Sequence, residues 1–212
     1  MISSIIPENT IDFIRKTLVH TKGEKREVML IIDMINDFLH EKGVLYSERH
    51  KVLVPEMKHF LDKKYGEGAI LIFCCDAHIK GDETRYPVHA ISGSWGAEII
   101  DEFKSFCGKE RVFTILKRSP DAFLGTFLQT ILEFLKPEKL TVLGVCTDIC
   151  DKSTVQGAVY RGFTGIRVVT DLVATFHIPG IHDGDALHRS ALEEIKGNLG
   201  VELIESFSEI SL

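Results

Sequence analysis

The sequence predicts a three-layer α/β/α domain in which helices cover both faces of a doubly wound, six-stranded, mostly parallel sheet. Short apolar runs, rich in valine and isoleucine, are uninterrupted, as in strands that are buried on both faces. Segments with one apolar helical face alternate with these runs, which is the pattern of βαβ units. A chain of 212 residues fits one such domain, so we expect a single domain over 1–212, with 1–26 as an N-terminal helical extension.

The first half of the chain is predicted to alternate between helices and strands. Apolar residues at helical spacing occur at 7–20, and the apolar run EVMLIIDM then predicts a strand at 27–34. Polar residues and a glycine predict a loop at 36–46, followed by a helix at 54–63 and the strand AILIFCC at 69–75. A long polar connection, 75–95, leads to a helix at 95–106, which begins after Ser94, and to the strand RVFTIL at 111–116.

The second half continues the same alternation. Helical spacing predicts a helix at 123–135, and the β-branched run LTVLGV predicts a buried strand at 140–145. A tight turn of small and polar residues then leads into a helix at 148–160, followed by a strand at 166–170. A loop that carries several histidines precedes a helix at 185–196 and a last strand at 201–204.

Composition and charge exclude several classes of function. The net charge is −6 without a basic run, which argues against nucleic acid and anionic membranes as partners. No apolar stretch approaches the ~20 residues of a membrane span, and the N-terminus lacks the pattern of a secretory signal. The chain has five cysteines, an odd number, and reduced thiols are the rule inside cells. We therefore expect a cytoplasmic protein whose partners are neither nucleic acid nor membranes.

Polar or reactive residues follow several of the predicted strands. In a doubly wound sheet the ligand crevice lies outside the carboxyl ends of the strands. Asp33 closes the first strand, and Asp76 and His78 follow the second. Lys117 follows the third strand, and the segment 146–150 follows the fourth. These positions are therefore the candidates for one active-site crevice.

Cys150 is a candidate nucleophile. It lies in the first turn of the helix predicted at 148–160, with Thr147 or Asp148 as the N-cap. Free N–H groups and the helix dipole at such a position favour a thiolate. The alternative is that Cys150 is a small buried apolar residue, as most free cysteines are.

Asp33 and Lys117 can be given chemical roles or structural ones. A carboxylate after an apolar strand is poorly hydrated, which raises its pKa and suits a general base for a thiol. It could instead be a solvated aspartate that caps the next turn. A buried Lys117 would hold both Asp33 and a thiolate in their charged forms. The alternative is a lysine that reaches the rim of the sheet.

Asp76, His78 and His89 are candidate metal ligands. Asp76 and His78 are two residues apart on an extended segment and therefore point the same way, and carboxylates and imidazoles bind zinc, iron or manganese. Asp82 or Glu83 is a candidate for a fourth ligand. The alternative is a set of polar loop residues that never meet. The later histidines, His177, His182 and His188, are interpreted as part of a solvated lid or subunit contact.

Four segments together resemble the isochorismatase-like cysteine hydrolase superfamily, and within it the nicotinamidases. The segments occur in the family's order and span residues 28 to about 176, most of the chain. They are DMINDF at 33–38; Asp76 and His78 followed by YPVH at 86–89 and GSWGAE at 93–98; Lys117 followed by Asp121, Ala122, Phe123 and Thr126; and GVCTDIC at 144–150.

The resemblance implies a catalytic triad and an oxyanion hole. Cys150 would be the nucleophile, Asp33 would accept and return its proton, and Lys117 would stabilise the charged pair. Family members have a cis peptide at the position of Val145–Cys146. It would direct the N–H groups of Cys146 and Cys150 at the developing oxyanion. The implied reaction converts nicotinamide to nicotinate and ammonia through a thioester, a step of NAD salvage.

The resemblance also implies a metal and a ring-binding pocket. A divalent metal, zinc in the first place and iron or manganese otherwise, would be held by Asp76, His78 and His89 and would orient the pyridine nitrogen. Phe38 and Tyr86 match positions that pack against the ring, and a homo-oligomer is expected. Two features depart from the family pattern, because Ile35 replaces a glutamine and the span from Asp76 to His89 is short.

Two other functions stay open at this point. One is a metal-free amidase of the same superfamily, acting on a carbamoyl compound or another small amide. The other is a non-catalytic member of the fold that binds a metal or a ligand. The complete set of Asp33, Lys117 and Cys150 argues against the second, because a binding protein does not need all three.

Overall fold

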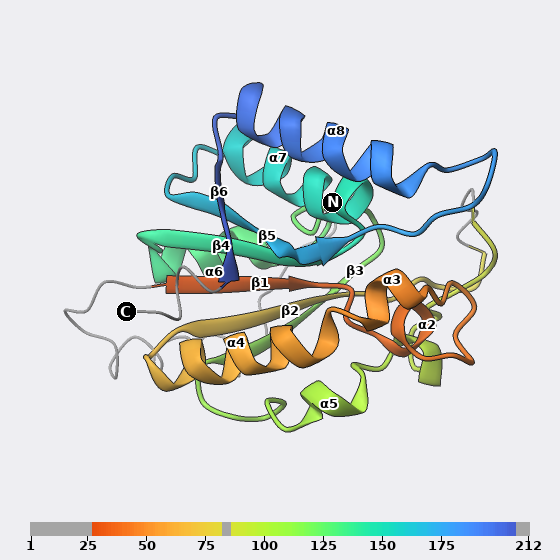
Figure 1. Cartoon of the computed structure of the whole chain (residues 1–212). Helices are drawn as coiled ribbons and strands as arrows, with labels where there is room; N and C mark the ends of the chain where they lie inside the picture. Colours follow the sequence, from red (N-terminus) through yellow and green to blue (C-terminus); the bar gives the residue numbers. More distant parts are fainter. Residues whose placement is uncertain (1–26, 82–85, 207–212) are drawn as a thin grey trace.

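The computed structural model describes residues 27–81 and 86–206 (Figure 1). The helix predicted at 7–20, and with it the extension over 1–26, lies outside the described residues, as do Asp82 and Glu83. None of the helices in the described ranges is long and apolar enough to cross a membrane.

A six-stranded sheet forms the middle layer, with the strand order β3-β2-β1-β4-β5-β6 and parallel pairing between all neighbours. The strands are β1 (Glu27–Ile32), β2 (Ile70–Asp76), β3 (Val112–Lys117), β4 (Lys139–Val145), β5 (Ile166–Ala174) and β6 (Glu202–Ile204). The six predicted strands are confirmed, although β5 extends beyond the predicted segment. Strand order reverses at β1 and β4, whose carboxyl ends are therefore neighbours at the switch point of the sheet.

Helices cover both faces of this sheet (Figure 1). On one face lie α4 (Val54–Gly66) and α5 (Asp101–Lys104), and on the other α6 (Leu128–Leu135), α7 (Lys152–Tyr160) and α8 (Gly184–Gly197). The short helices α2 (Asn36–Leu39) and α3 (Glu48–Lys51) follow β1. The prediction of a three-layer α/β/α domain is confirmed.

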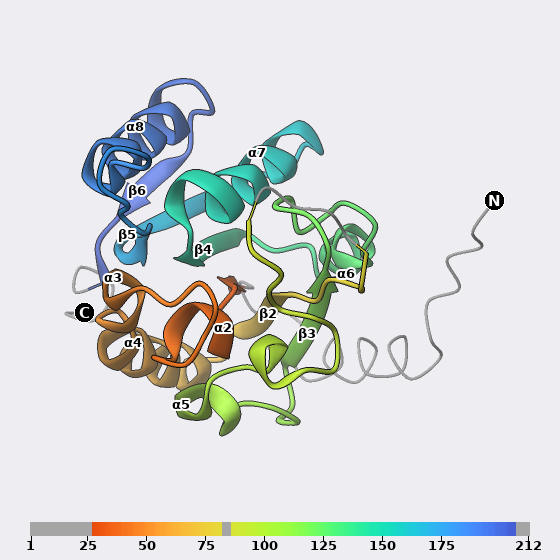
Figure 2. The same cartoon turned by 90° about the vertical axis from the view of Figure 1, so that its right-hand side faces the viewer.

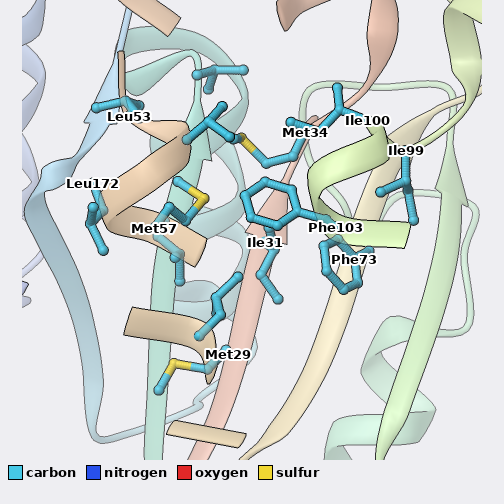
Figure 3. Packing of buried hydrophobic residues seen from close by; sticks show 14 of the residues in the cluster. Met29, Ile31, Met34, Leu53, Met57, Phe73, Ile99, Ile100, Phe103 and Leu172 are labelled. Atoms are coloured by element: carbon cyan, nitrogen blue, oxygen red, sulfur yellow. The ribbon is translucent and has the colours of Figure 1, made fainter. Parts of the chain in front are cut away.

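The apolar core has one half on each face of the sheet. Met29 and Ile31 of β1 pack with Met57 of α4 and Phe103 of α5, as Figure 3 shows. The alternate residues of β1, such as Leu30, pack with α6, α7 and α8 on the other face. Because β1 is covered on both sides, its sequence is an uninterrupted apolar run.

Some helices differ from the predictions because long-range contacts override local spacing. The segment predicted as one helix at 95–106 is divided into a 3-10 helix, η1 (Trp95–Ala97), and α5. Between them the chain is extended, since Ile99 pairs with Ile35 and the Ile100 N–H donates to the Met34 carbonyl.

Three further boundaries differ. The helix predicted at 123–135 begins only at Leu128, after a turn in which Gly125 has φ +72°. The loop predicted at 36–46 contains α2. The helix predicted at 148–160 begins as a π-helical turn, η2 (Thr147–Asp151), which continues into α7.

Candidate active site

Asp33 is held rigidly at the carboxyl end of β1. Its backbone is in the left-handed region, with φ 52°, and its N–H donates to the Cys74 carbonyl. The side-chain Oδ1 accepts a hydrogen bond of 2.7 Å from the Asp76 N–H. This carboxylate is completely buried, so β1 and β2 together fix where it points.

Gly144 allows β4 to come close to β1 beside Asp33. Its φ is +139°, and a Cβ at this position would lie 2.2 Å from the Ile32 carbonyl oxygen. Only glycine fits such an approach without displacing the backbone. The turn that carries Cys150 therefore begins directly beside Asp33.

Lys117 connects the side chains that follow three strands. It is the register partner of Asp76, and its side chain is fully buried. Its Nζ lies 2.8 Å from Asp33 Oδ2 and 2.5 Å from Asp76 Oδ1. The same amine lies 3.5 Å from the Sγ of Cys150. The structure thus brings together the three residues that the resemblance implied as a triad.

The Val145–Cys146 peptide is cis, as the resemblance implied. Residues 147–151 form the π-helical turn η2, in which the N–H groups of Ile149 and Asp151 donate to the Cys146 carbonyl. The expectation that Thr147 or Asp148 caps a helix is wrong, because Cys146 precedes the turn and no side chain caps it. The wider turn leaves Cys150 8% exposed and beside Lys117.

The electrostatics suit a thiol with a separate base. Burial raises the pKa of Cys150 well above its usual value, and the charge of Lys117 opposes this only in part. Burial and the neighbouring Asp76 raise the pKa of Asp33 to about 6, against the opposing effect of Lys117. At neutral pH the resting pair is therefore a protonated thiol and an ionised carboxylate, which is the correct combination for general-base activation.

Asp76, His78 and His89 form a cluster with metal-ligating geometry, in which each offers a ligand atom within 4.8 Å of the others. Asp76 Oδ2 lies 3.6 Å from His78 Nε2 and 3.8 Å from His89 Nε2. The His89 Nδ1–H donates to the Pro87 carbonyl, so its Nε2 is directed at the cluster. These oxygen and nitrogen donors fit a divalent ion such as zinc, iron or manganese.

A loop contact explains how His89 reaches His78. The His78 N–H donates to the Ala90 carbonyl, and the Ser92 N–H donates to the His78 carbonyl. The chain after His89 therefore lies alongside the chain at His78, as a parallel bridge between His78 and Ile91. No local sequence pattern signals this pairing.

Aromatic rings surround the cluster. Phe38 lies edge-on to His89 with 5.5 Å between ring centroids, and Tyr86 lies edge-on to the same ring at 6.3 Å. The two residues that the resemblance assigned to ring packing thus lie beside a candidate metal ligand.

Several buried polar residues near the site escaped sequence reasoning. Asp151 is fully buried beside Cys150, and its two carboxylate oxygens have no hydrogen-bond partner among the described residues. His50 is also fully buried, and its Nε2 lies 3.6 Å from Cys146 Sγ. Both belong to segments that look polar in sequence, so only their tertiary surroundings reveal them.

The interpretation of the later histidines as solvated is wrong for His182. His188 is solvated only in part. The side chain of His182 is 13% exposed, and its Nε2 lies 3.5 Å from Asp148 Oδ2. The half-buried His188 pairs through Nδ1 with the Thr147 hydroxyl at 3.0 Å. Both contact the η2 turn, whereas His177 is exposed. A loop histidine carries no periodic signal that would have predicted this.

The sequence of this chain matches a known protein family. A family model described as the isochorismatase domain matches residues 27–206, which is most of the chain. The chain belongs to the isochorismatase family. The prediction of an isochorismatase-like hydrolase is thereby confirmed.

Three similar proteins illustrate the range of this family. The nicotinamidase PncA of Bacillus subtilis is 28% identical, with a TM-score of 0.76 over 86% of this chain and 100% of its own. The pyrazinamidase/nicotinamidase of Streptococcus mutans UA159 is 27% identical, with a TM-score of 0.75 over 84% of this chain and 99% of its own. A relative from Arabidopsis thaliana, 28% identical over 77% of this chain and 87% of its own, is named a probable inactive nicotinamidase. Proteins similar to this chain are thus named both as nicotinamidases and as a probable inactive nicotinamidase.

Proposed function

We propose that this protein is a metal-dependent cysteine amidohydrolase that converts nicotinamide to nicotinate and ammonia. The observation that carries the proposal is the position of Lys117, whose Nζ contacts Asp33 at 2.8 Å and Cys150 at 3.5 Å inside a buried site. A protein that only binds a ligand has no need of a buried amine between a thiol and a carboxylate. The two nicotinamidases that resemble this chain support the choice of substrate.

The first half of the reaction forms a thioester. Asp33 accepts the proton of the Cys150 thiol, and the sulfur attacks the carboxamide carbon. The N–H groups of Cys146 and Cys150 stabilise the oxyanion. Asp33 then returns the proton to the leaving nitrogen, so that ammonia departs and the acyl group stays on Cys150.

The second half releases the acid. Asp33 accepts a proton from a water molecule, which attacks the thioester, and then gives this proton to the departing sulfur, so that the thiol of Cys150 is regenerated. The acid product leaves and loses its own proton to solvent as nicotinate. Lys117 keeps its charge throughout. Burial would lower its pKa, but the charges of Asp33, Cys150 and Asp76 raise the pKa well above the usual lysine value. This fixed positive charge stabilises whichever of its neighbours is negative at each step.

Asp76, His78 and His89 would hold the metal. A divalent ion there would bind the pyridine nitrogen, directly or through water, and would thereby orient the ring. Burial raises the pKa of Asp76, but Lys117 and hydrogen bonds from His78 and His89 lower it well below its usual value, so the carboxylate is ionised. Phe38 and Tyr86 would pack against the substrate ring and exclude water from it.

Ammonia release from nicotinamide tests the proposal. Wild type loaded with zinc, iron or manganese is compared with Cys150→Ala and His89→Ala, and the controls are Cys107→Ala and His59→Ala, which alter an exposed cysteine and an exposed histidine. We expect both site variants to lose activity and both controls to keep it. Full activity in His89→Ala would favour the metal-free amidase. Wild type that is inert on every amide but binds nicotinamide as Cys150→Ala does would favour a binding protein.

A further inference from the structure

Two loops from distant strands meet through aromatic side chains. Tyr86 belongs to the connection after β2, and Phe176 lies two residues beyond the end of β5. Their ring centroids are 6.5 Å apart and the rings are nearly perpendicular, at 87°. This is an edge-to-face pair of the favourable kind. We call this contact the aromatic bridge.

The topology of the sheet places the aromatic bridge over the candidate site. Between β2 and β5 lie β1 and β4, so the two loops start roughly 14 Å apart, at ~4.8 Å per strand. Both loops leave at the carboxyl edge, on the side that faces the viewer in Figure 2. A contact between the two loops therefore passes above the ends of β1 and β4. Asp33 lies at the end of β1, and the turn to Cys150 lies at the end of β4.

Phe176 is held in position from the nucleophile side. The His182 ring stacks on it, with centroids 3.9 Å apart and planes inclined by 17°. His182 Nε2 in turn lies 3.5 Å from Asp148 Oδ2 and 3.3 Å from the Thr175 hydroxyl. Asp148 is only two residues before Cys150. The position of Phe176 is thus tied to the turn that carries the thiol.

Tyr86 lies at the other end of the candidate site, beside the candidate metal cluster. It contacts His89, one of the candidate metal ligands, at 6.3 Å between centroids. Tyr86, at one end of the aromatic bridge, thus contacts the candidate metal cluster. Phe176, at the other end, is connected through His182 to the turn that carries the thiol. In the proposed reaction, a substrate that reaches both the metal and the thiol would pass beneath the two rings.

We propose that Phe176, positioned by His182, is a specificity-determining residue that selects amides with a flat aromatic ring. The inference rests on the proposed amidohydrolase function and adds a residue to it. A flat ring beneath the aromatic bridge offers a face and edges to Tyr86 and Phe176. A saturated ring of the same size is thicker and has no π face. Removal of Phe176 therefore weakens binding of the aromatic amide more than that of its saturated counterpart.

Two amides with six-membered rings test the inference: nicotinamide and cyclohexanecarboxamide. Ammonia release gives kcat and KM for each with metal-loaded wild type, Phe176→Ala, Phe176→Tyr and His182→Ala. Ile181→Ala is the control, because this side chain belongs to the same loop and is 83% exposed. Since each preference is a ratio measured on one sample, a partly unfolded variant does not distort it.

We expect Phe176→Ala to lower the preference for nicotinamide about tenfold, mainly through a higher KM. His182→Ala should shift the preference in the same direction, and Phe176→Tyr and Ile181→Ala should keep it. An active wild type with an unchanged preference in Phe176→Ala overturns this inference and leaves the proposed function intact. Wild type that is inert on nicotinamide overturns both.

Discussion

Lys117 Nζ lies 2.5 Å from Asp76 Oδ1, while the other oxygen of the same carboxylate faces His78 and His89. Asp76 therefore belongs to two sets of residues. It neutralises the buried amine beside Cys150, and it is a candidate ligand of the metal. In the proposed mechanism, this one side chain links the chemistry of the thiol to the binding of the metal.

This link predicts that Asp76→Asn lowers kcat more than His89→Ala does. Both substitutions weaken metal binding, but only the first removes a charged partner of Lys117. A hydrogen bond to a charged group is worth about 1.5–3 kcal/mol, so the additional loss in kcat should be at least tenfold. Metal content and kcat at saturating nicotinamide and metal are the measurements. Equal losses of kcat in the two variants would contradict the link.

Lys117→Met should destabilise the protein strongly. The substitution leaves Asp33 and Asp76 as two buried carboxylates without their shared cation, and loss of one partner of a buried ion pair costs about 3–5 kcal/mol. Lys152→Met is the matched control. Its pair with Glu194 at 3.1 Å is partly exposed, with 27% and 47% of the two side chains exposed, so the cost should stay below about 1 kcal/mol. The free energy of unfolding in urea distinguishes the two, and similar costs would mean that Lys117 is not a buried ion-pair partner.

Asp151→Asn should stabilise the protein near neutral pH. Burial, followed by the charge of Asp33, raises the pKa of Asp151 well above its usual value. The folded state therefore binds this proton more tightly than the unfolded chain does. The resulting stabilisation is complete below pH ~4 and is lost as the pH rises toward the folded-state pKa.

The asparagine variant removes this particular dependence on pH. We expect a gain of about 1–3 kcal/mol at pH 7 and a flatter profile of unfolding free energy above pH ~4. Urea unfolding midpoints of wild type and Asp151→Asn, measured over this pH range, test both expectations. A loss of stability in Asp151→Asn at pH 7 would show that the carboxylate has a favourable partner in its ionised form.

Gly144→Ala should disturb the site through the backbone. The new Cβ would lie 2.2 Å from the Ile32 carbonyl oxygen, and its φ of +139° is unfavourable for alanine. We expect a loss of more than about 2 kcal/mol and a lower kcat, because β4 must move away from β1 beside Asp33. Gly66→Ala, where nothing lies within 4 Å of the new Cβ, should change stability by less than about 1 kcal/mol. Thermal unfolding of the two variants tests whether the close approach of β1 and β4 is required.

The strand ends could be predicted from the sequence because parallel strands that are buried on both faces have uninterrupted apolar sequences. Once these runs are assigned to one sheet, the residues that follow them must share an edge. Asp33, Lys117 and Cys150 could therefore be grouped at one edge of the sheet from the sequence alone. The distances between these side chains and their degree of burial could not be predicted, because they depend on the register of β2 with β3 and on the close approach at Gly144.

Other features depend on contacts that leave no local signal. The helix predicted at 95–106 is broken because Ile99 pairs with Ile35, more than sixty residues earlier in the chain. His182 looked like a solvated loop residue, but it packs between Phe176 and Asp148. In each case tertiary contacts outweigh local propensity.

The partition of the acyl group between water and hydroxylamine tests whether amide hydrolysis passes through a thioester on Cys150. Metal-loaded wild type is given nicotinamide at increasing hydroxylamine concentration, and ammonia, nicotinate and nicotinohydroxamate are measured. We expect hydroxamate to replace nicotinate as hydroxylamine increases, and Cys150→Ala to form neither product. Nicotinate released by wild type without hydroxamate at any hydroxylamine concentration, or hydrolysis that persists in Cys150→Ala, would contradict the thioester route.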